Sequence, residues 1–116
     1  MRNLFKILAL SFICLSSSAF AENAPISVEI TNGYSSILKR YHPVISITSE
    51  VDRIQILGLT ANRGNCEATL KGSFPGDPQQ KTLAFGDVVQ YNAFHCQKIR
   101  EVIIHTDQGE WTYSLR

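Results

Sequence analysis

Two cysteines, Cys66 and Cys96, are the residues of this chain whose type and spacing most directly predict chemistry. They lie far apart without a Cys-x-x-Cys motif, and the third cysteine, Cys14, lies near the start of the chain. An isolated pair of this kind is typical of a structural disulfide in an oxidising compartment. His95 directly precedes Cys96, but neighbouring strand residues face opposite ways, which argues against a Cys–His catalytic dyad. The sequence therefore predicts a structural Cys66–Cys96 disulfide.

The remaining polar side chains predict no active site. His42, His95 and His105 lie on three separate predicted segments, without the short spacing of a metal-ligand set. The carboxylates are scattered, and neither a Gly-x-Ser-x-Gly motif nor a phosphate-binding glycine loop occurs. We therefore predict no catalytic residue, no metal site and no cofactor, and we expect the chain not to be an enzyme.

Residues 1–21 have the pattern of an export signal. Arg2 and Lys6 give a positive start, residues 7–15 form an apolar run, and residues 19–21 give an Ala-Phe-Ala cleavage site. The apolar run is too short to span a bilayer as a stable helix. We predict a signal peptide over 1–21, cleavage after Ala21, one domain over 22–116 and a secreted or periplasmic location.

The charge balance argues against two classes of partner. Without Arg2 and Lys6, nine of the 11 basic residues remain beside 10 acidic residues. A near-neutral, mixed surface offers no electrostatic attraction to nucleic acid or to an anionic membrane. No second long apolar run follows residue 21. We therefore expect neither nucleic-acid binding nor membrane insertion.

Short runs rich in Val, Ile, Thr, Tyr and Phe, broken by Gly, Pro, Asn and Asp, predict strands joined by turns. No window after residue 21 has the spacing of an amphipathic helix. The strands are expected over 26–30, 37–42, 44–49, 53–61, 66–70, 81–85, 88–94, 99–106 and 110–115. Their number favours an all-β fold, a small immunoglobulin- or fibronectin type III-like β-sandwich with one disulfide, and a small barrel is the alternative.

Several positions within this pattern carry finer expectations. Asn32-Gly33 is the best turn dipeptide, and Pro43 marks an edge, a bulge or a strand break. The strand over 53–61 is apolar on both faces through its middle, so it should be central or covered on one side by a partner. Residues 71–80 form the longest loop, and residues 107–109 form a three-residue hairpin loop.

The aromatic residues divide into core and contact candidates. Phe85, Tyr91 and Phe94 are expected in the core. Tyr34 and Phe74 lie in turn-rich segments, where an aromatic side chain can anchor a protein contact, and Tyr41 precedes the His42-Pro43 pair. We therefore take Tyr34, Tyr41 and Phe74 as candidate partner-binding residues.

Segments 83–87, 95–96 and 106–113 resemble those of the interleukin receptor mimic family of small secreted bacterial antigens. The resemblance covers most of residues 22–116 in size and layout. It implies a fibronectin type III-like domain, a strand-exchanged homodimer and the binding of host cytokines through a receptor-like surface. It assigns no contact residues. Strand exchange would need a hinge, which Tyr41, His42 and Pro43 could supply.

Two functions follow from these observations. The first is a secreted, non-enzymatic module that binds a host protein, such as a cytokine. The alternative is an envelope or pilus-like structural or accessory subunit in the periplasm, which would assemble by strand addition at an exposed sheet edge. A periplasmic enzyme or inhibitor ranks last, because no catalytic constellation is present.

Overall fold

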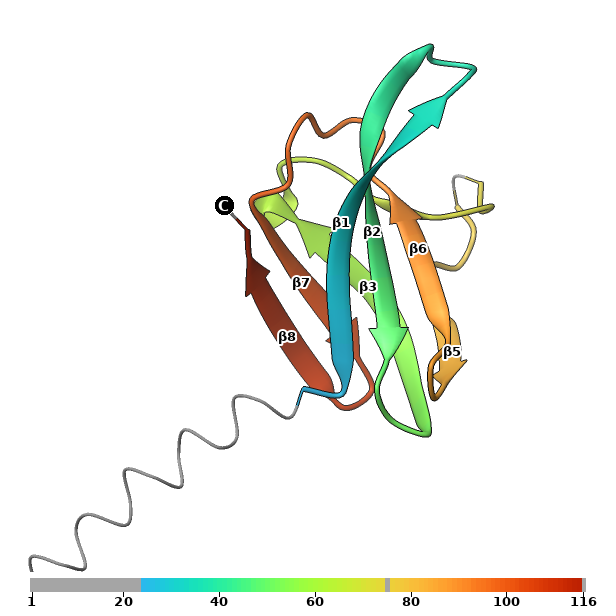
Figure 1. Cartoon of the computed structure of the whole chain (residues 1–116), viewed down its shortest axis with the longest axis vertical. Helices are drawn as coiled ribbons and strands as arrows, with labels where there is room; N and C mark the ends of the chain where they lie inside the picture. Colours follow the sequence, from blue (N-terminus) through green and yellow to red (C-terminus); the bar gives the residue numbers. More distant parts are fainter. Residues whose placement is uncertain (1–23, 75, 116) are drawn as a thin grey trace, which may run out of the picture.

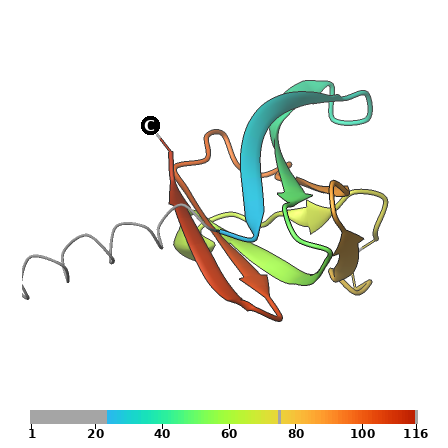
Figure 2. The ribbon, with the colours of Figure 1, turned by 60° about the horizontal axis from the view of Figure 1, so that its bottom comes forward.

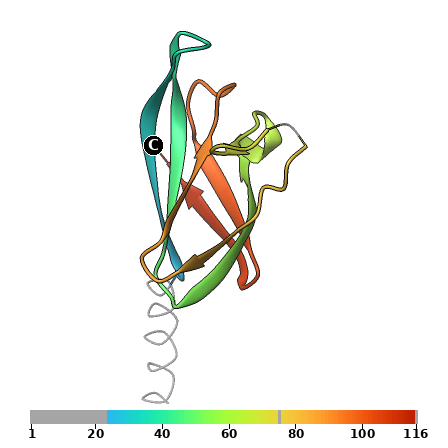
Figure 3. The same cartoon turned by 90° about the vertical axis from the view of Figure 1, so that its right-hand side faces the viewer.

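The computed structural model describes residues 24–74 and 76–115. Two antiparallel sheets of four strands face each other (Figures 1 and 3). The first sheet has the order β1 (Ile26–Ser35), β2 (Arg40–Ser49), β6 (Val88–Asn92) and β4 (Thr69–Leu70). The second has the order β5 (Lys81–Ala84), β3 (Arg53–Ala61), β7 (Glu101–Thr106) and β8 (Gly109–Ser114). The predicted all-β sandwich is confirmed, whereas the predicted signal peptide lies outside the described residues.

The strand order is that of an immunoglobulin-type sandwich. The first sheet follows the A-B-E-D arrangement, and the second follows C-F-G with β5 added at its edge. The core lies between the sheets because every second residue of each strand points inward. Its fully buried members come from both sheets and include Ile45, Ile47, Tyr91, Ile54, Ile56, Val102 and Ile104.

The strand β3 occupies the predicted central position, with β5 on one side and β7 on the other. Its bounds agree with the predicted 53–61. The ladder to β7 shifts register between Ile56 and Gly58, where Gly58 has a φ of 149°. This irregularity lets one strand curve around the core while it keeps both neighbours.

The expected turn at Asn32-Gly33 is wrong, because both residues belong to β1 and pair with Pro43 and His42 of β2. The chain turns at residues 36–39 instead, with Lys39 at a φ of 56°. A Cβ atom at Gly33 would lie 2.8 Å from Val44 Cγ2. Glycine is therefore needed there for close cross-strand approach, which a turn-based interpretation of Asn-Gly does not consider.

Pro43 does not break its strand, and the strand expected over 37–42 begins only at Arg40. The carbonyl oxygen of Pro43 accepts a hydrogen bond from Ala93 N over 3.0 Å, so this residue's polar groups face the β6 side. The β2–β6 ladder itself begins at Val44. Pro43 has no N–H with which to return this bond, so the β2–β6 ladder stops here, while Pro43 still pairs with Asn32 of β1.

Smaller expectations changed in the same way. The strand expected over 66–70 is reduced to Thr69–Leu70, and Cys66 forms only an isolated bridge with Ala61. The long loop over 71–80 is confirmed. The last hairpin turns through two residues, since Thr106 pairs directly with Gly109. Tyr91 is in the core and Phe94 is half-buried, but Phe85 is 65% exposed at the β5–β6 turn, so its core assignment is wrong.

Candidate functional site

The β1–β2 hairpin extends past the end of the sandwich (Figures 1 and 2). We call residues 34–41 the hairpin tip. Its turn is closed by Lys39 N, which donates to Ser35 O over 2.7 Å, and by Leu38 N, which donates to Ser35 Oγ over 3.1 Å. Four large apolar side chains of the tip are exposed, namely Tyr34 (56%), Ile37 (89%), Leu38 (45%) and Tyr41 (73%).

The hairpin tip brings two of the three candidate contact residues together. Tyr34 and Tyr41 are directly opposite in the β1–β2 ladder, and their ring centroids lie 5.0 Å apart in an edge-to-face arrangement. Such a pair holds both rings in place while each keeps most of its surface exposed. Phe74 is 75% exposed on the separate 71–80 loop, where Asp77 Oδ2 accepts a hydrogen bond from its backbone N over 2.7 Å.

The root of the hairpin rests on the segment that follows β6. Arg40 Nη2 donates to the carbonyl oxygen of Phe94 over 3.1 Å. The Phe94 ring packs on the His42 ring with centroids 4.5 Å apart. His42 Nε2 lies 3.3 Å from Asn92 Oδ1, which the neutral tautomer with hydrogen on Nε2 satisfies. These contacts fix the direction in which the hairpin leaves the sandwich.

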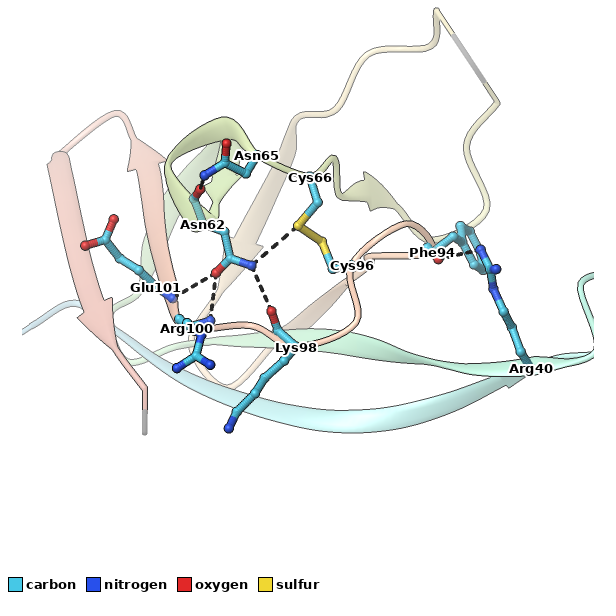
Figure 4. The surroundings of a disulfide bond; sticks show 9 residues. All are labelled: Arg40, Asn62, Asn65, Cys66, Phe94, Cys96, Lys98, Arg100 and Glu101. Atoms are coloured by element: carbon cyan, nitrogen blue, oxygen red, sulfur yellow. Dashed lines mark hydrogen bonds between the residues drawn. A yellow bond between two sulfur atoms is a disulfide. The ribbon is translucent and has the colours of Figure 1, made fainter.

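The predicted disulfide is confirmed: Cys66 and Cys96 are bonded, with a Cα–Cα distance of 5.4 Å (Figure 4). Cys66 is attached to the second sheet through its bridge to Ala61 at the end of β3. Cys96 follows the end of β6 in the first sheet, two residues after Phe94. The bond therefore links the two sheets at the end from which the hairpin projects.

Asn62 organises the surroundings of the disulfide, a role that no sequence motif predicts. Its Nδ2 donates to Lys98 O over 2.8 Å and lies 3.6 Å from Cys66 Sγ (Figure 4). Its Oδ1 accepts from Arg100 N over 2.7 Å and from Glu101 N over 3.2 Å. Asn62 has a φ of 50°, a left-handed conformation that asparagine adopts more readily than most residues. The one local signal is the turn-like composition of residues 62–65, Asn-Arg-Gly-Asn, directly before Cys66.

The histidines do not converge. His42 is part of the hairpin root and His95 is exposed. His105 Nδ1 lies 2.7 Å from Glu110 Oε2 and its Nε2 lies 2.8 Å from Thr60 Oγ1, within a network on the second sheet. Within residues 24–74 and 76–115, no group of three His, Cys, Asp or Glu side chains gathers as metal ligands.

Two tyrosines have shifted pKa values for structural reasons. Burial raises the pKa of Tyr91 from 10.0 to about 12, and the Tyr91 hydroxyl donates to the carbonyl oxygen of Gln79. Burial also raises the pKa of Tyr113, whose hydroxyl donates to Ile26 O over 3.1 Å. Both hydroxyl groups join separate segments of the sandwich, which is a stabilising role.

Comparison with protein-family models, curated proteins and solved structures finds no significant match to this chain. Within the described part of the chain, no helix has the length and apolar character needed to cross a membrane. The arrangement of the hairpin tip is therefore the basis for the functional argument that follows.

Proposed function

We propose that this chain is an exported, non-enzymatic module that binds another protein through its hairpin tip. The observation that carries the proposal is the exposure of four large apolar side chains on one projecting hairpin. Apolar side chains gathered in this way are a common mark of an interaction site, whereas single exposed apolar residues are normal. Tyrosine pairs also bury much area at little cost in side-chain entropy.

The proposed partner is a host protein of the cytokine class. The resemblance to secreted interleukin receptor mimic antigens supports this choice, and so does the small sandwich that carries the hairpin. The leader pattern over 1–21 and the disulfide support export. A homodimer formed by strand exchange belongs to the same proposal. Tyr41, His42 and Pro43, which the sequence suggested as its hinge, lie within the continuous strand β2 and pair with β1.

The test uses the full chain expressed with its leader and purified after export. Binding to a panel of immobilised cytokines is measured for the wild type and for Tyr34→Ser/Tyr41→Ser. The double variant should bind any positive cytokine at least about ten-fold more weakly, because two central aromatic contacts are lost. Phe85→Ser is the matched control, since Phe85 is equally exposed at the opposite end of the sandwich. Absence of binding to every cytokine would remove this partner class, and an unaffected double variant would contradict the role of the tip.

A second candidate function rests on the outer edge of β1. This strand has ten residues, lies at the end of its sheet and, among residues 24–74 and 76–115, pairs with β2 alone. An edge of this length could receive a strand from another subunit, as in envelope or pilus-like assemblies. Native mass measurement separates the two functions: open-ended polymers support the subunit, and a discrete dimer supports the binding module.

A further inference from the structure

A small second cluster lies on the outer face of the first sheet, at the hairpin root. Val44 and His42 are buried, yet they lie outside the main core, because Ile45 and Ile47 take the inward-facing positions of β2. Close approach of Gly33 and the packing of Phe94 cover this second cluster. The face is consequently concave at the root of the hairpin.

An open recess of about 440 Å³ occupies this concave face. Its apolar walls come from Ile37 at the turn and from Phe94 after β6, and its polar floor includes Asn92. Lys71 lies at its rim, on the loop that follows β4. The recess is therefore lined mainly by polar groups, together with some apolar surface and the cation Lys71, and such a mixture is suited to recognition.

Three cations lie in or near the recess: Lys71 lines it, and Lys39 and Arg40 are on the adjoining turn and strand. Lys71 Nζ donates to the neutral side chain of Gln90 over 3.3 Å, and Arg40 donates to the backbone oxygen of Phe94. Lys39 is exposed at the turn. Among the described residues, none of these three cations forms an ion pair with a carboxylate. Charges oriented by neutral acceptors keep their full attraction for a negative group on a partner.

Acidic residues are scarce at the hairpin end of the sandwich and more frequent at the other end. Residues 31–49 contain no Asp or Glu. Four exposed carboxylates occur instead in the β2–β3, β5–β6 and β7–β8 turns, namely Glu50, Asp52, Asp87 and Asp107. These turns lie at the end of the sandwich opposite the hairpin tip (Figure 1). On the face of the recess, Glu29 lies four residues before Gly33 along β1, and Glu67 lines a neighbouring hollow. The hairpin end thus has a positive character that the net charge of the chain does not reveal.

We infer that this recess receives a carboxylate side chain that lies next to a large apolar side chain on the partner. The carboxylate would be drawn by Lys71 in the lining and by Lys39 and Arg40 beside it, and the apolar group would pack against Phe94 and Ile37. This inference rests on the proposed function and specifies the chemistry of the partner surface.

The experiment measures amide shifts of ¹⁵N-labelled protein during titration with two blocked peptides, Glu-Phe-Glu-Leu and Gln-Phe-Gln-Leu. At about 5 mM, where millimolar affinity already gives high occupancy, the acidic peptide should shift Gly33, Lys71 and Asn92. It should bind about five- to ten-fold more tightly than the neutral peptide, and added salt should remove the difference. Lys39→Gln/Lys71→Gln should also remove it, whereas Lys98→Gln, on the connection before β7, should not.

Equal affinities for the two peptides, or no shifts around Gly33 with the acidic one, would overturn the inference. The outcome is separable from that of the proposed function, because the Tyr34/Tyr41 variants are measured by cytokine binding, whereas the lysine variants are measured by the difference in affinity between the two peptides. If the tyrosine variants lose cytokine binding but the two peptides bind equally well, the hairpin tip remains the binding site and the acidic partner surface is rejected. If the acidic peptide binds more tightly but the tyrosine variants bind cytokines normally, the recess remains a binding site and the role of the hairpin tip is rejected.

Discussion

Arg40 Nη2 and the backbone oxygen of Phe94 are joined by a hydrogen bond of 3.1 Å, which fastens the projecting hairpin to the segment leading to Cys96. The bond spans 54 positions in sequence, so it ties the arm of the hairpin to a distant part of the chain. Because the hairpin tip has few contacts of its own beyond its turn, its order depends on this root.

Arg40→Gln should loosen the hairpin tip without unfolding the sandwich. The shorter side chain loses the bond to Phe94 O, and we expect amide hydrogen exchange over residues 34–41 to become about three- to ten-fold faster. Global stability should fall by less than about 1 kcal/mol, because the bond is exposed. Lys39→Gln is the control and should leave exchange unchanged. Equal exchange rates in the two variants would show that the root is not fixed by Arg40.

Removal of the disulfide should lower the free energy of unfolding much more than Arg40→Gln does. Cys66→Ser/Cys96→Ser frees a loop of 30 positions, and the chain-entropy contribution of such a loop is about 3–4 kcal/mol. Urea unfolding should show this loss, and the reduced wild type should agree with the double variant. Cys14→Ser, within the predicted leader, is the control and should change nothing. A loss below about 1 kcal/mol would mean that the surrounding hydrogen bonds already hold this end closed.

The sequence predicted the sandwich well because alternation and turn residues are local properties. Residues 44–49 alternate in character along the sequence, and they form part of the strand β2. The apolar residues on both faces of 53–61 correctly placed β3 in the interior of its sheet. The disulfide was equally predictable, since the two cysteines after residue 21 leave one simple pairing.

What the sequence could not predict depends on partners distant along the chain. Asn32-Gly33 has the composition of a turn, and only the packing of His42 and Val44 against it explains why glycine stands in a strand. Phe85 and Phe94 both lie just outside strands, yet the Phe94 ring packs on His42 whereas the Phe85 ring is exposed to solvent. The recess could not be predicted for the same reason, because its lining residues Ile37, Lys71 and Phe94 come from three separate segments.

Asn62 provides a test of such long-range contacts. Asn62→Ala removes the hydrogen bonds to Lys98 O, Arg100 N and Glu101 N and leaves a left-handed backbone that alanine tolerates poorly. We expect a loss of about 2–3 kcal/mol in the free energy of unfolding. Asn62→Gly, which relieves the backbone but not the lost bonds, should recover about 1 kcal/mol of it.

Asn65→Ala is the matched control, because it removes a single exposed hydrogen bond, from Asn65 Nδ2 to Asn62 O over 2.9 Å. It should cost less than about 1 kcal/mol. Similar losses at both positions, measured by urea unfolding, would contradict the organising role of the Asn62 side chain.

Tyr91 makes the stability of the sandwich depend on alkaline pH. Burial raises the pKa of Tyr91 from 10.0 to about 12 in the folded chain, so between these values the folded chain keeps a proton that the unfolded chain releases. The stabilisation is therefore complete below about pH 10 and is lost as the pH rises towards 12. The difference between the two pKa values corresponds to a loss of about 2–3 kcal/mol at most in the free energy of unfolding. Burial also raises the pKa of Tyr113, so this residue changes the stability in the same direction.

Urea unfolding between about pH 8 and pH 11.5 measures this slope. Tyr91→Phe should be less stable than the wild type by about 1 kcal/mol at neutral pH, because it lacks the hydroxyl that donates to Gln79 O. Its stability should then fall less steeply with pH, so that the two curves converge in the alkaline range. Tyr41→Phe, on the exposed hairpin tip, should keep the wild-type slope. Parallel curves for Tyr91→Phe and the wild type would mean that another group causes the alkaline loss of stability.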